Sequence, residues 1–213
     1  MKFASIIFDL DGTLLDSSGD ILSTLSLAIE ETGLCPAVRP DKAVVGPPVS
    51  EMLKKLLPSI SPSQTDAAVS AFRKHYDASS YPGTKFYPGM RETLDRLRSE
   101  GVRLFIATNK PEVPTRRVLD AVHAGPFDGM VCVNSLPGRT LSKADMISKI
   151  LVDWQLDKDS TLMVGDCDSD MTAAKASGIK GAAVLWGYGM DAISSCGADF
   201  RVSSASELIA IVL

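Results

Sequence analysis

Two aspartates near the start of the chain, Asp9 and Asp11, have the residue types and spacing of a reaction centre. They follow an apolar run at 3–8 that is long enough for one buried strand. Because side chains alternate along an extended chain, the two carboxylates point the same way and can share one cation or one phosphoryl group. Gly12 then allows a tight turn in which its N–H can approach an anion. A solvated turn after a strand is the alternative for the same residues.

Two more polar groups stand where predicted helices begin. Thr108 and Asn109 combine a hydroxyl and an amide with the free N–H groups of a first helical turn, which can bind phosphate. An ordinary helix cap is the alternative. Lys143 opens another helix, where a cation is slightly unfavourable for the helix dipole, and there it would neutralise a bound anion. A solvated surface lysine is its alternative, and Lys110 is the other candidate for an active-site lysine.

A third polar cluster, Asp166, Asp168 and Asp170, follows the apolar segment at 161–164. Acids at alternate positions are typical of a calcium-binding loop. That loop needs glycine at its sixth position and glutamate at its twelfth, and this chain has Met171 and Ser177 there. We therefore reject a calcium loop and interpret the cluster as a further set of polar groups at the end of a strand.

The segments that carry these residues alternate between strand and helix patterns. Apolar strand patterns occupy 3–8, 103–107, 129–133, 161–164 and 181–186, and helical patterns occupy 90–100, 112–122, 143–154 and 169–177. Such alternation predicts an α/β fold, in which a Rossmann-like parallel sheet is covered by helices on both faces. In sheets of this kind the chemistry lies at the carboxyl ends of the strands, where all the polar groups above occur.

The alternation is interrupted between residues 17 and 86. Helical patterns occupy 20–33, 49–57 and 62–79, and we find no strand pattern between 16 and 87. The sequence therefore predicts an all-helical cap domain at 17–86, inserted into a core domain formed by 1–16 and 87–213. We expect the two crossings between them, at 15–18 and 81–86, to act as hinges.

The composition restricts the partners. The 213 residues carry a formal net charge of −4, and their lysines and arginines are scattered, which argues against nucleic acid. No apolar run approaches the ~18 residues of a membrane span, and the N-terminus lacks a signal-peptide pattern, so we expect a cytoplasmic protein without a membrane partner. The four cysteines lack the spacing of a metal site or a disulfide framework. A monomer and a homodimer both remain open.

Four segments, in order, resemble the motifs of one family. The string FDLDGTL at 8–14 resembles the first motif of the haloacid dehalogenase-like (HAD) phosphohydrolases. TNKP at 108–111, the lysine at 143 and GDCDSD at 165–170 resemble the second, third and fourth motifs. The turn WGYG at 186–189 resembles phosphoglycolate phosphatase-like members of the family. The string GYGMDA at 187–192 also fits a dinucleotide-binding pattern, but too little chain follows it for a complete βαβ unit.

The resemblance implies a reaction and a role for each acid. Asp9 would be the nucleophile that forms an aspartyl-phosphate, and Asp11 the general acid and base. Thr108 would bind a phosphoryl oxygen, and Lys143 would neutralise the charge of the substrate. Because dehalogenase relatives lack an acid at the position of Asp11, its presence favours hydrolysis of a phosphate ester.

The family also implies a cofactor. Mg²⁺ would be held by the carboxylates of Asp9 and Asp166 and by the backbone carbonyl of Asp11. The resemblance makes Asp170 a residue that orients the site, and Asp168 a helix cap. We predict a magnesium-dependent phosphatase that acts on a small phosphate monoester, phosphoglycolate or a related metabolite.

Three other functions are compatible with the same residues. A phosphomutase or a pyrophosphatase of the same superfamily would use the same acids with a different cap. A phospho-accepting signalling domain would also use an aspartate, a threonine, a lysine and Mg²⁺, but such domains are shorter and lack the helical insert. Substrate choice would lie with the cap, and the turn at 45–48 is our candidate contact.

Overall fold

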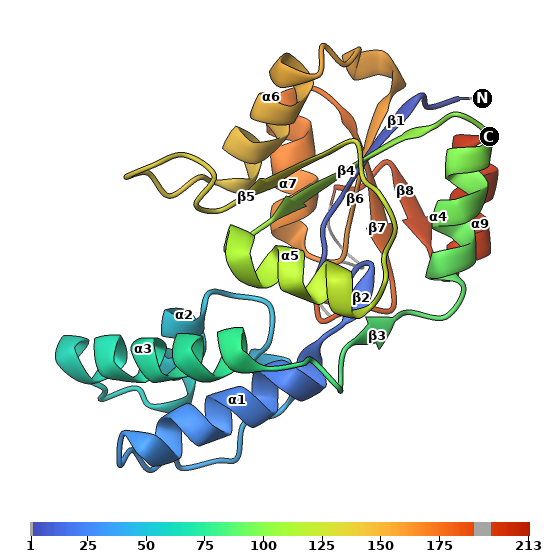
Figure 1. The fold of residues 1–213 in the computed structure, drawn as a ribbon. Coiled ribbons are helices and arrows are strands. Elements are labelled where there is room, and N and C mark those ends of the chain that lie inside the picture. Colours follow the sequence, from blue (N-terminus) through green and yellow to red (C-terminus); the bar gives the residue numbers. More distant parts are fainter. Residues whose placement is uncertain (1, 190–196) are drawn as a thin grey trace.

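The computed structural model describes residues 2–189 and 197–213, and its centre is a six-stranded sheet (Figure 1). The strands lie in the order β5-β4-β1-β6-β7-β8, and every neighbouring pair is parallel. They are β1 (Ser5–Phe8), β4 (Arg103–Thr108), β5 (Gly129–Cys132), β6 (Thr161–Gly165), β7 (Lys180–Val184) and β8 (Phe200–Val202). The predicted α/β fold is confirmed.

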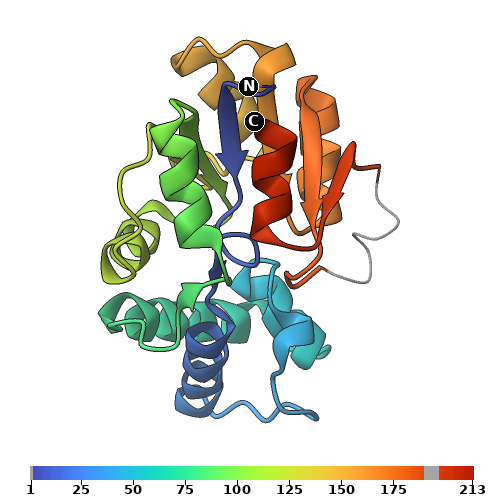
Figure 2. The same cartoon turned by 90° about the vertical axis from the view of Figure 1, so that its right-hand side faces the viewer.

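Helices cover both faces of this sheet, as the alternation of side chains along β1 requires. Ile7 packs into a cluster with residues of α6 and α7, whereas Ile6 and Phe8 pack into the cluster that includes residues of α4, α5 and α9. Figure 2 shows α4 and α9 on the face opposite to α6 and α7. The helices are α4 (Met90–Ser99), α5 (Glu112–Ala121), α6 (Lys143–Asp153), α7 (Asp168–Ser177) and α9 (Ala205–Val212).

The carboxyl ends of the parallel strands meet at one edge of the sheet. β1 lies in the middle, between β4 and β6, and Phe8 is in register with Ile106 and Val164. The N–H of Asp9 continues the ladder by donating to the carbonyl oxygen of Val164 at 2.9 Å. Side chains that follow these three strands are therefore brought to one place, although nearly the whole chain separates them in sequence.

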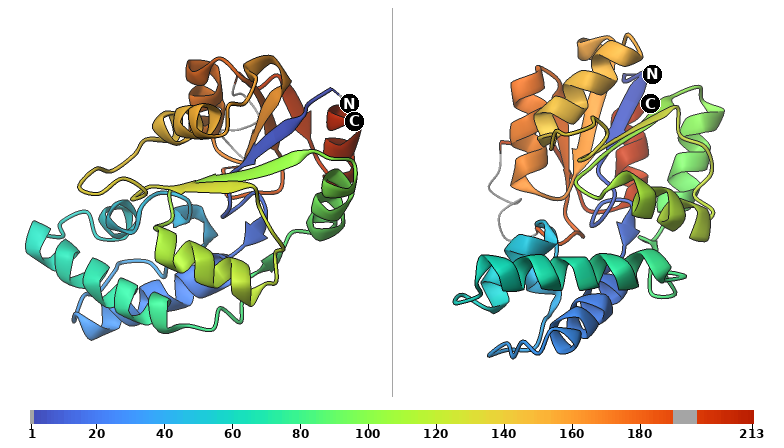
Figure 3. Two further views of the ribbon diagram at one scale, coloured as in Figure 1. Left: turned by 45° about the horizontal axis from the view of Figure 1, so that its top comes forward. Right: turned by 60° about the vertical axis from the view of Figure 1, so that its left-hand side comes forward.

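The segment at 17–86, which we call the insert, is helical as predicted and lies below this edge (Figures 1 and 3). It contains α1 (Ser18–Glu31), a short 3₁₀ helix (Lys42–Val44), α2 (Val49–Leu56) and α3 (Pro62–Ala78). Ser61 caps α3 by a capping box with Gln64, which agrees with the predicted start of that helix. No described helix is both long and apolar enough to cross a bilayer.

One expectation for this region was wrong. The chain forms a strand β3 (Lys85–Phe86) inside the range where we expected none, and it pairs antiparallel with β2 (Leu15–Asp16). The two crossings between core and insert run side by side, so their backbone groups satisfy each other. A two-residue strand is too short to leave a periodic signal in the sequence. The strand β8 and the helix α9 were also not predicted.

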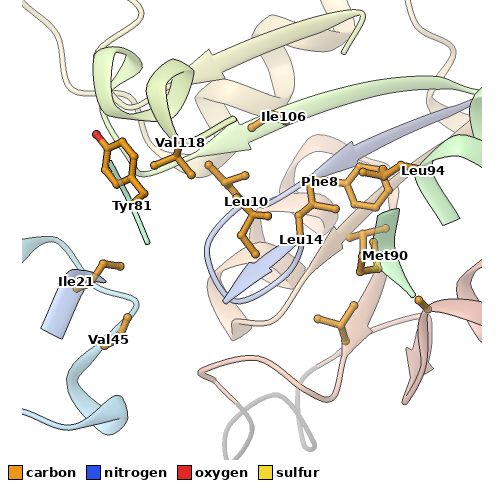
Figure 4. Close-up of a cluster of buried hydrophobic side chains, with 14 of the residues drawn as sticks. Phe8, Leu10, Leu14, Ile21, Val45, Tyr81, Met90, Leu94, Ile106 and Val118 are labelled. Atoms are coloured by element: carbon orange, nitrogen blue, oxygen red, sulfur yellow. The ribbon is translucent and has the colours of Figure 1, made fainter. Parts of the chain in front are cut away.

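Apolar packing is continuous from the sheet to the insert. Figure 4 shows Leu10 and Leu14 of the turn after β1 between Val118 of α5 and Met90 of α4, with Ile21 and Val45 of the insert nearby. All six side chains belong to one buried cluster. The turn that carries the two aspartates is thus held on an apolar base. The residues 190–192 of the dinucleotide-like string lie outside the described residues.

Candidate active site

The first carboxylate after β1, Asp9, is paired with the lysine that begins α6. Lys143 Nζ lies 2.5 Å from Asp9 Oδ1 and 3.0 Å from Asp170 Oδ1, and it donates to the carbonyl oxygen of Ala107 at 2.9 Å. Ser142 caps α6 through its bond with Asp145, which fixes the backbone from which the lysine extends. The structure therefore brings Asp9, Lys143 and Asp170 together.

These charges are buried, which perturbs their titration. Burial raises the pKa of Asp9 above its ordinary value, Lys143 opposes this, and the Asp170 and Asp166 carboxylates add to it. For Lys143, burial alone would lower the pKa, but the carboxylates of Asp170 and Asp9 outweigh burial and raise it. The lysine is therefore charged at neutral pH, and it stabilises negative charge on Asp9.

Asp166, which follows β6, is fully buried and held from two sides. The hydroxyl of Thr13 donates to its Oδ1 at 3.0 Å, and the N–H groups of Tyr188 and Gly189 donate to its Oδ2 at 2.7 and 3.3 Å. Burial, followed by the charge of Asp170, raises the pKa of Asp166 to about 6. Three donors thus orient this carboxylate.

Gly12 lies directly against Asp166. A Cβ at Gly12 would stand 2.4 Å from Asp166 Oδ2, and the residue has a φ of +96°. Its N–H, which we expected to face an anion, donates instead to the carbonyl oxygen of Leu15 at 2.8 Å. The glycine is therefore needed for the turn and for the close approach of the two carboxylate-bearing segments.

The second carboxylate, Asp11, has its own lysine. Lys110 Nζ lies 2.7 Å from Asp11 Oδ2, and the hydroxyl of Ser17 donates to Asp11 Oδ1 at 2.5 Å. The same ammonium lies 4.8 Å from the ring centroid of Tyr76, which belongs to α3 of the insert. Of the two candidate lysines, Lys143 contacts Asp9 and Lys110 contacts Asp11.

The remaining predicted residues differ in their placement. Thr108 is buried at the end of β4, and its Oγ1 accepts a hydrogen bond from the N–H of Lys110 at 3.1 Å. Asn109 is exposed, so its side chain is not drawn into the buried cluster. Asp168 is the exposed first residue of α7.

Sequence reasoning missed three residues that position the carboxylates: Thr13, Ser17 and Tyr188. Thr13 and Tyr188 contact Asp166, and Ser17 contacts Asp11. Thr13 and Tyr188 lay within the strings that carried the family resemblance, and that was their only signal. No local pattern shows which carboxylate such a residue contacts.

The site can therefore be described as four carboxylates, those of Asp9, Asp11, Asp166 and Asp170, around two ammonium groups, those of Lys110 and Lys143. If all six groups are ionised, the cluster has an excess of two negative charges. Groups of this kind at a sheet edge fit both a divalent cation and a phosphoryl group.

Comparison with known proteins gives the family. The family model described as haloacid dehalogenase-like hydrolase matches residues 6–184. The chain belongs to this family. The match includes the four carboxylates and the two lysines of the site, and it ends before Tyr188.

Individual relatives cover nearly the whole chain. A phosphoglycolate phosphatase from Aquifex aeolicus is 32% identical over 209 residues, which are 97% of this chain and 95% of that protein. A haloacid dehalogenase-like hydrolase from Streptococcus pneumoniae has a solved structure with a TM-score of 0.84 at 27% identity, covering 100% of this chain and 99% of that one. The chain is thus a HAD phosphatase of the phosphoglycolate phosphatase-like subgroup.

A third relative carries a different name. The tyrosine-protein kinase PtkA of Mycobacterium tuberculosis is 35% identical over 186 residues, which are 86% of this chain and 62% of that protein. The same type of chain is therefore found in proteins named for two kinds of phosphoryl chemistry.

Proposed function

We propose that this protein is a magnesium-dependent phosphatase that hydrolyses a small phosphate monoester through an aspartyl-phosphate on Asp9. The observation that carries the proposal is the ion pair of Asp9 with Lys143 at the carboxyl edge of the sheet, with Asp11 two residues further on. A nucleophilic carboxylate with an adjacent acid is what ester hydrolysis through a covalent intermediate requires.

The residues present fit a divalent cation. The excess of negative charge described above needs compensation, and Gly12 keeps the space beside Asp166 Oδ2 free of a side chain. Asp9, Asp166 and the backbone carbonyl of Asp11 would hold the ion. When bound, Mg²⁺ would cancel charge between the nucleophile and the phosphoryl group.

The chain's own residues then account for both half-reactions. Asp9 attacks the phosphorus and forms the acyl phosphate, while Asp11 gives its proton to the departing alkoxide oxygen. Asp11, now ionised, removes a proton from water, which attacks the phosphorus and restores Asp9 with release of phosphate. Lys143 holds Asp9 in place, and the hydroxyl of Thr108 would bind a phosphoryl oxygen.

We further propose that the insert (17–86) acts as a cap on a core formed by 1–16 and 87–213. Its placement below the carboxyl edge supports this role (Figure 3). In such an arrangement the leaving group would lie between the insert and the edge, and the turn at 45–48 remains our candidate contact. The name of the Aquifex aeolicus relative makes 2-phosphoglycolate the first ester to test.

The experiment measures phosphate release from 2-phosphoglycolate and p-nitrophenyl phosphate, with Mg²⁺ or with EDTA. We expect turnover only with the metal, and none in Asp9→Asn. Asp168→Asn is the matched control, because this aspartate is exposed and should be dispensable. Turnover by Asp9→Asn would refute the nucleophile. Phosphorylation without turnover would indicate a phospho-accepting domain instead.

A further inference from the structure

The loop after β7 contains a residue with two separate contacts in the site. The N–H of Tyr188 donates to Asp166 Oδ2 at 2.7 Å, while its hydroxyl oxygen accepts from the N–H of Ser17 at 2.8 Å. The same hydroxyl donates to Asp16 Oδ1 at 3.3 Å. One residue therefore connects a carboxylate at the centre of the site to the first crossing into the insert.

The loop is held tightly at the Asp166 end. A Cβ at Gly187 would lie 2.2 Å from the Cβ of Asp166, and one at Gly189 would lie 2.4 Å from its carbonyl oxygen. Trp186 on the same loop donates its indole N–H to the carbonyl oxygen of Thr13 at 3.1 Å. The backbone of Tyr188 thus has little freedom, so its ring extends from a fixed base.

The other end of the connection reaches Asp11. Ser17 is fully buried and stands immediately before α1, and its hydroxyl donates to Asp11 Oδ1. The hydroxyl of Tyr188 fixes the backbone N–H of Ser17, and this in turn directs the serine hydroxyl at the carboxylate. Three hydrogen bonds, joined through the covalent frames of Tyr188 and Ser17, therefore connect Asp166 to Asp11.

We propose that Tyr188 is a positioning residue, whose hydroxyl holds Ser17 so that Asp11 is aligned to protonate the leaving group. This inference rests on the proposed function, because it takes Asp11 as the general acid. The turn at 186–189, in which Gly187 and Gly189 flank Tyr188, would then serve to position Asp11. Tyr188 acts only through Ser17, and it is not itself required to touch the substrate.

Leaving-group dependence distinguishes this role from simple packing. The alkoxide of 2-phosphoglycolate needs a proton to leave, whereas p-nitrophenolate leaves without one. In Tyr188→Phe the backbone N–H and the ring remain, and only the hydroxyl is lost. We expect kcat/KM for 2-phosphoglycolate to fall about tenfold, the effect of one hydrogen bond near a charged group. The value for p-nitrophenyl phosphate should change by less than about twofold.

Two further variants extend the test. Ser17→Ala removes the other half of the connection and should show the same selective loss, and the double variant should lose no more than either single one. The matched control is Tyr81→Phe, because the buried hydroxyl of Tyr81 has no hydrogen-bond partner among the described residues. It should leave both substrates unaffected. Thermal unfolding of each variant checks that the fold is intact.

The outcomes separate this inference from the proposed function. An equal loss on both substrates, or no loss at all, in Tyr188→Phe and Ser17→Ala would overturn the positioning role. Asp11→Asn serves as the reference and should show the same preference, but larger. A wild-type protein without activity on either ester would overturn the proposed function itself, and with it the role of Asp11.

Discussion

The carboxyl edge of the sheet, where Lys143 meets Asp9, and the junction with the insert, where Lys42 meets Asp16, are both held by ion pairs. The two pairs differ in their surroundings. At the edge, Lys143 bridges two carboxylates with 6% of its side chain exposed. At the junction, Lys42 of the insert reaches Asp16 at 3.0 Å with 66% of its side chain in solvent. The first contact is enclosed by protein and the second is open to water.

This difference determines what each contact can do. A buried charge that loses its partner is destabilising, because neither water nor another group replaces that partner. An exposed pair exchanges one partner for water at small cost. The groups assigned to chemistry are therefore fixed, whereas the junction can rearrange its polar contacts. That is the behaviour expected of a cap that closes over a rigid core.

The largest effect should come from breaking the buried pair. In Lys143→Met, the carboxylates of Asp9 and Asp170 lose their counter-charge, so we expect a loss of about 3–5 kcal/mol in the free energy of unfolding. Turnover should fall on the order of 10²–10³. Urea unfolding and phosphate release measure the two quantities.

A control for this substitution lies on the same helix. Lys149 pairs with Asp153 at 2.8 Å with about a third of its side chain exposed, and Lys149→Met should change stability by less than ~1 kcal/mol. Similar losses in the two variants would show that the edge is no more dependent on its charges than an ordinary helix surface.

The stabilisation of the protein by Mg²⁺ should depend on pH, because the buried Asp166 is a proposed metal ligand. The pKa of Asp166 is raised from 3.8 to about 6, so the metal-free native state binds a proton more readily than the unfolded chain. The protonated Asp166 contributes to the stability of the metal-free protein below about pH 4, and this contribution is lost as the pH rises through about 6. Mg²⁺ should therefore stabilise the protein more at about pH 7.5 than at about pH 5, by about 1.4 kcal/mol, because at the lower pH one proton on Asp166 competes with the metal about tenfold.

Thermal unfolding with and without Mg²⁺ at both pH values tests this expectation. Asp166→Asn cannot make the transition, so its response to Mg²⁺ should be small at both values. A shift of the same size at both pH values in the wild type would mean that Asp166 does not take part in binding the metal.

The sequence predicted the edge better than the junction, and for a physical reason. Asp9 and Asp11 follow directly on an apolar run, so one short string shows both the strand and the acids at its end. The contact of Ser17 with Tyr188 joins residues 171 positions apart. It exists only because β7 and the first crossing arrive at the same edge, and no periodicity records that.

The sequence did not predict the β2–β3 pair or the strand β8, for a related reason. The β2–β3 pair has two residues in each strand, and its register depends on the two crossings lying side by side. Phe200–Val202 is a three-residue strand at the edge of the sheet, and it is too short to show a pattern of its own. Local sequence predicts elements that bury one face over several residues. The short strands β2, β3 and β8 instead depend on the segments that pack beside them.

The contacts of Lys110 link the carboxyl edge of the sheet to the insert. Lys110 is as buried as Lys143, yet its ammonium lies over the ring of Tyr76 from the insert as well as beside Asp11. Tyr76→Leu removes the ring, and we expect kcat/KM to fall threefold to tenfold, the effect of losing one cation–π contact of ~1 kcal/mol. Tyr76→Phe keeps the ring and should stay near the wild type. Equal losses in the two variants would exclude the ring as the cause.

The smallest effect should come from the exposed pair at the junction. In Lys42→Met, the loss of stability should be ~0.5 kcal/mol, because water replaces most of what the ammonium provided to Asp16. Ser18 still donates two hydrogen bonds to this carboxylate. The variant should approach the wild type further as salt is raised, since screening already weakens the exposed pair. Thermal unfolding at low and high ionic strength measures this. A loss comparable to that of Lys143→Met would mean that the insert is fixed as rigidly as the carboxyl edge of the sheet, and closure of a mobile cap would then be excluded.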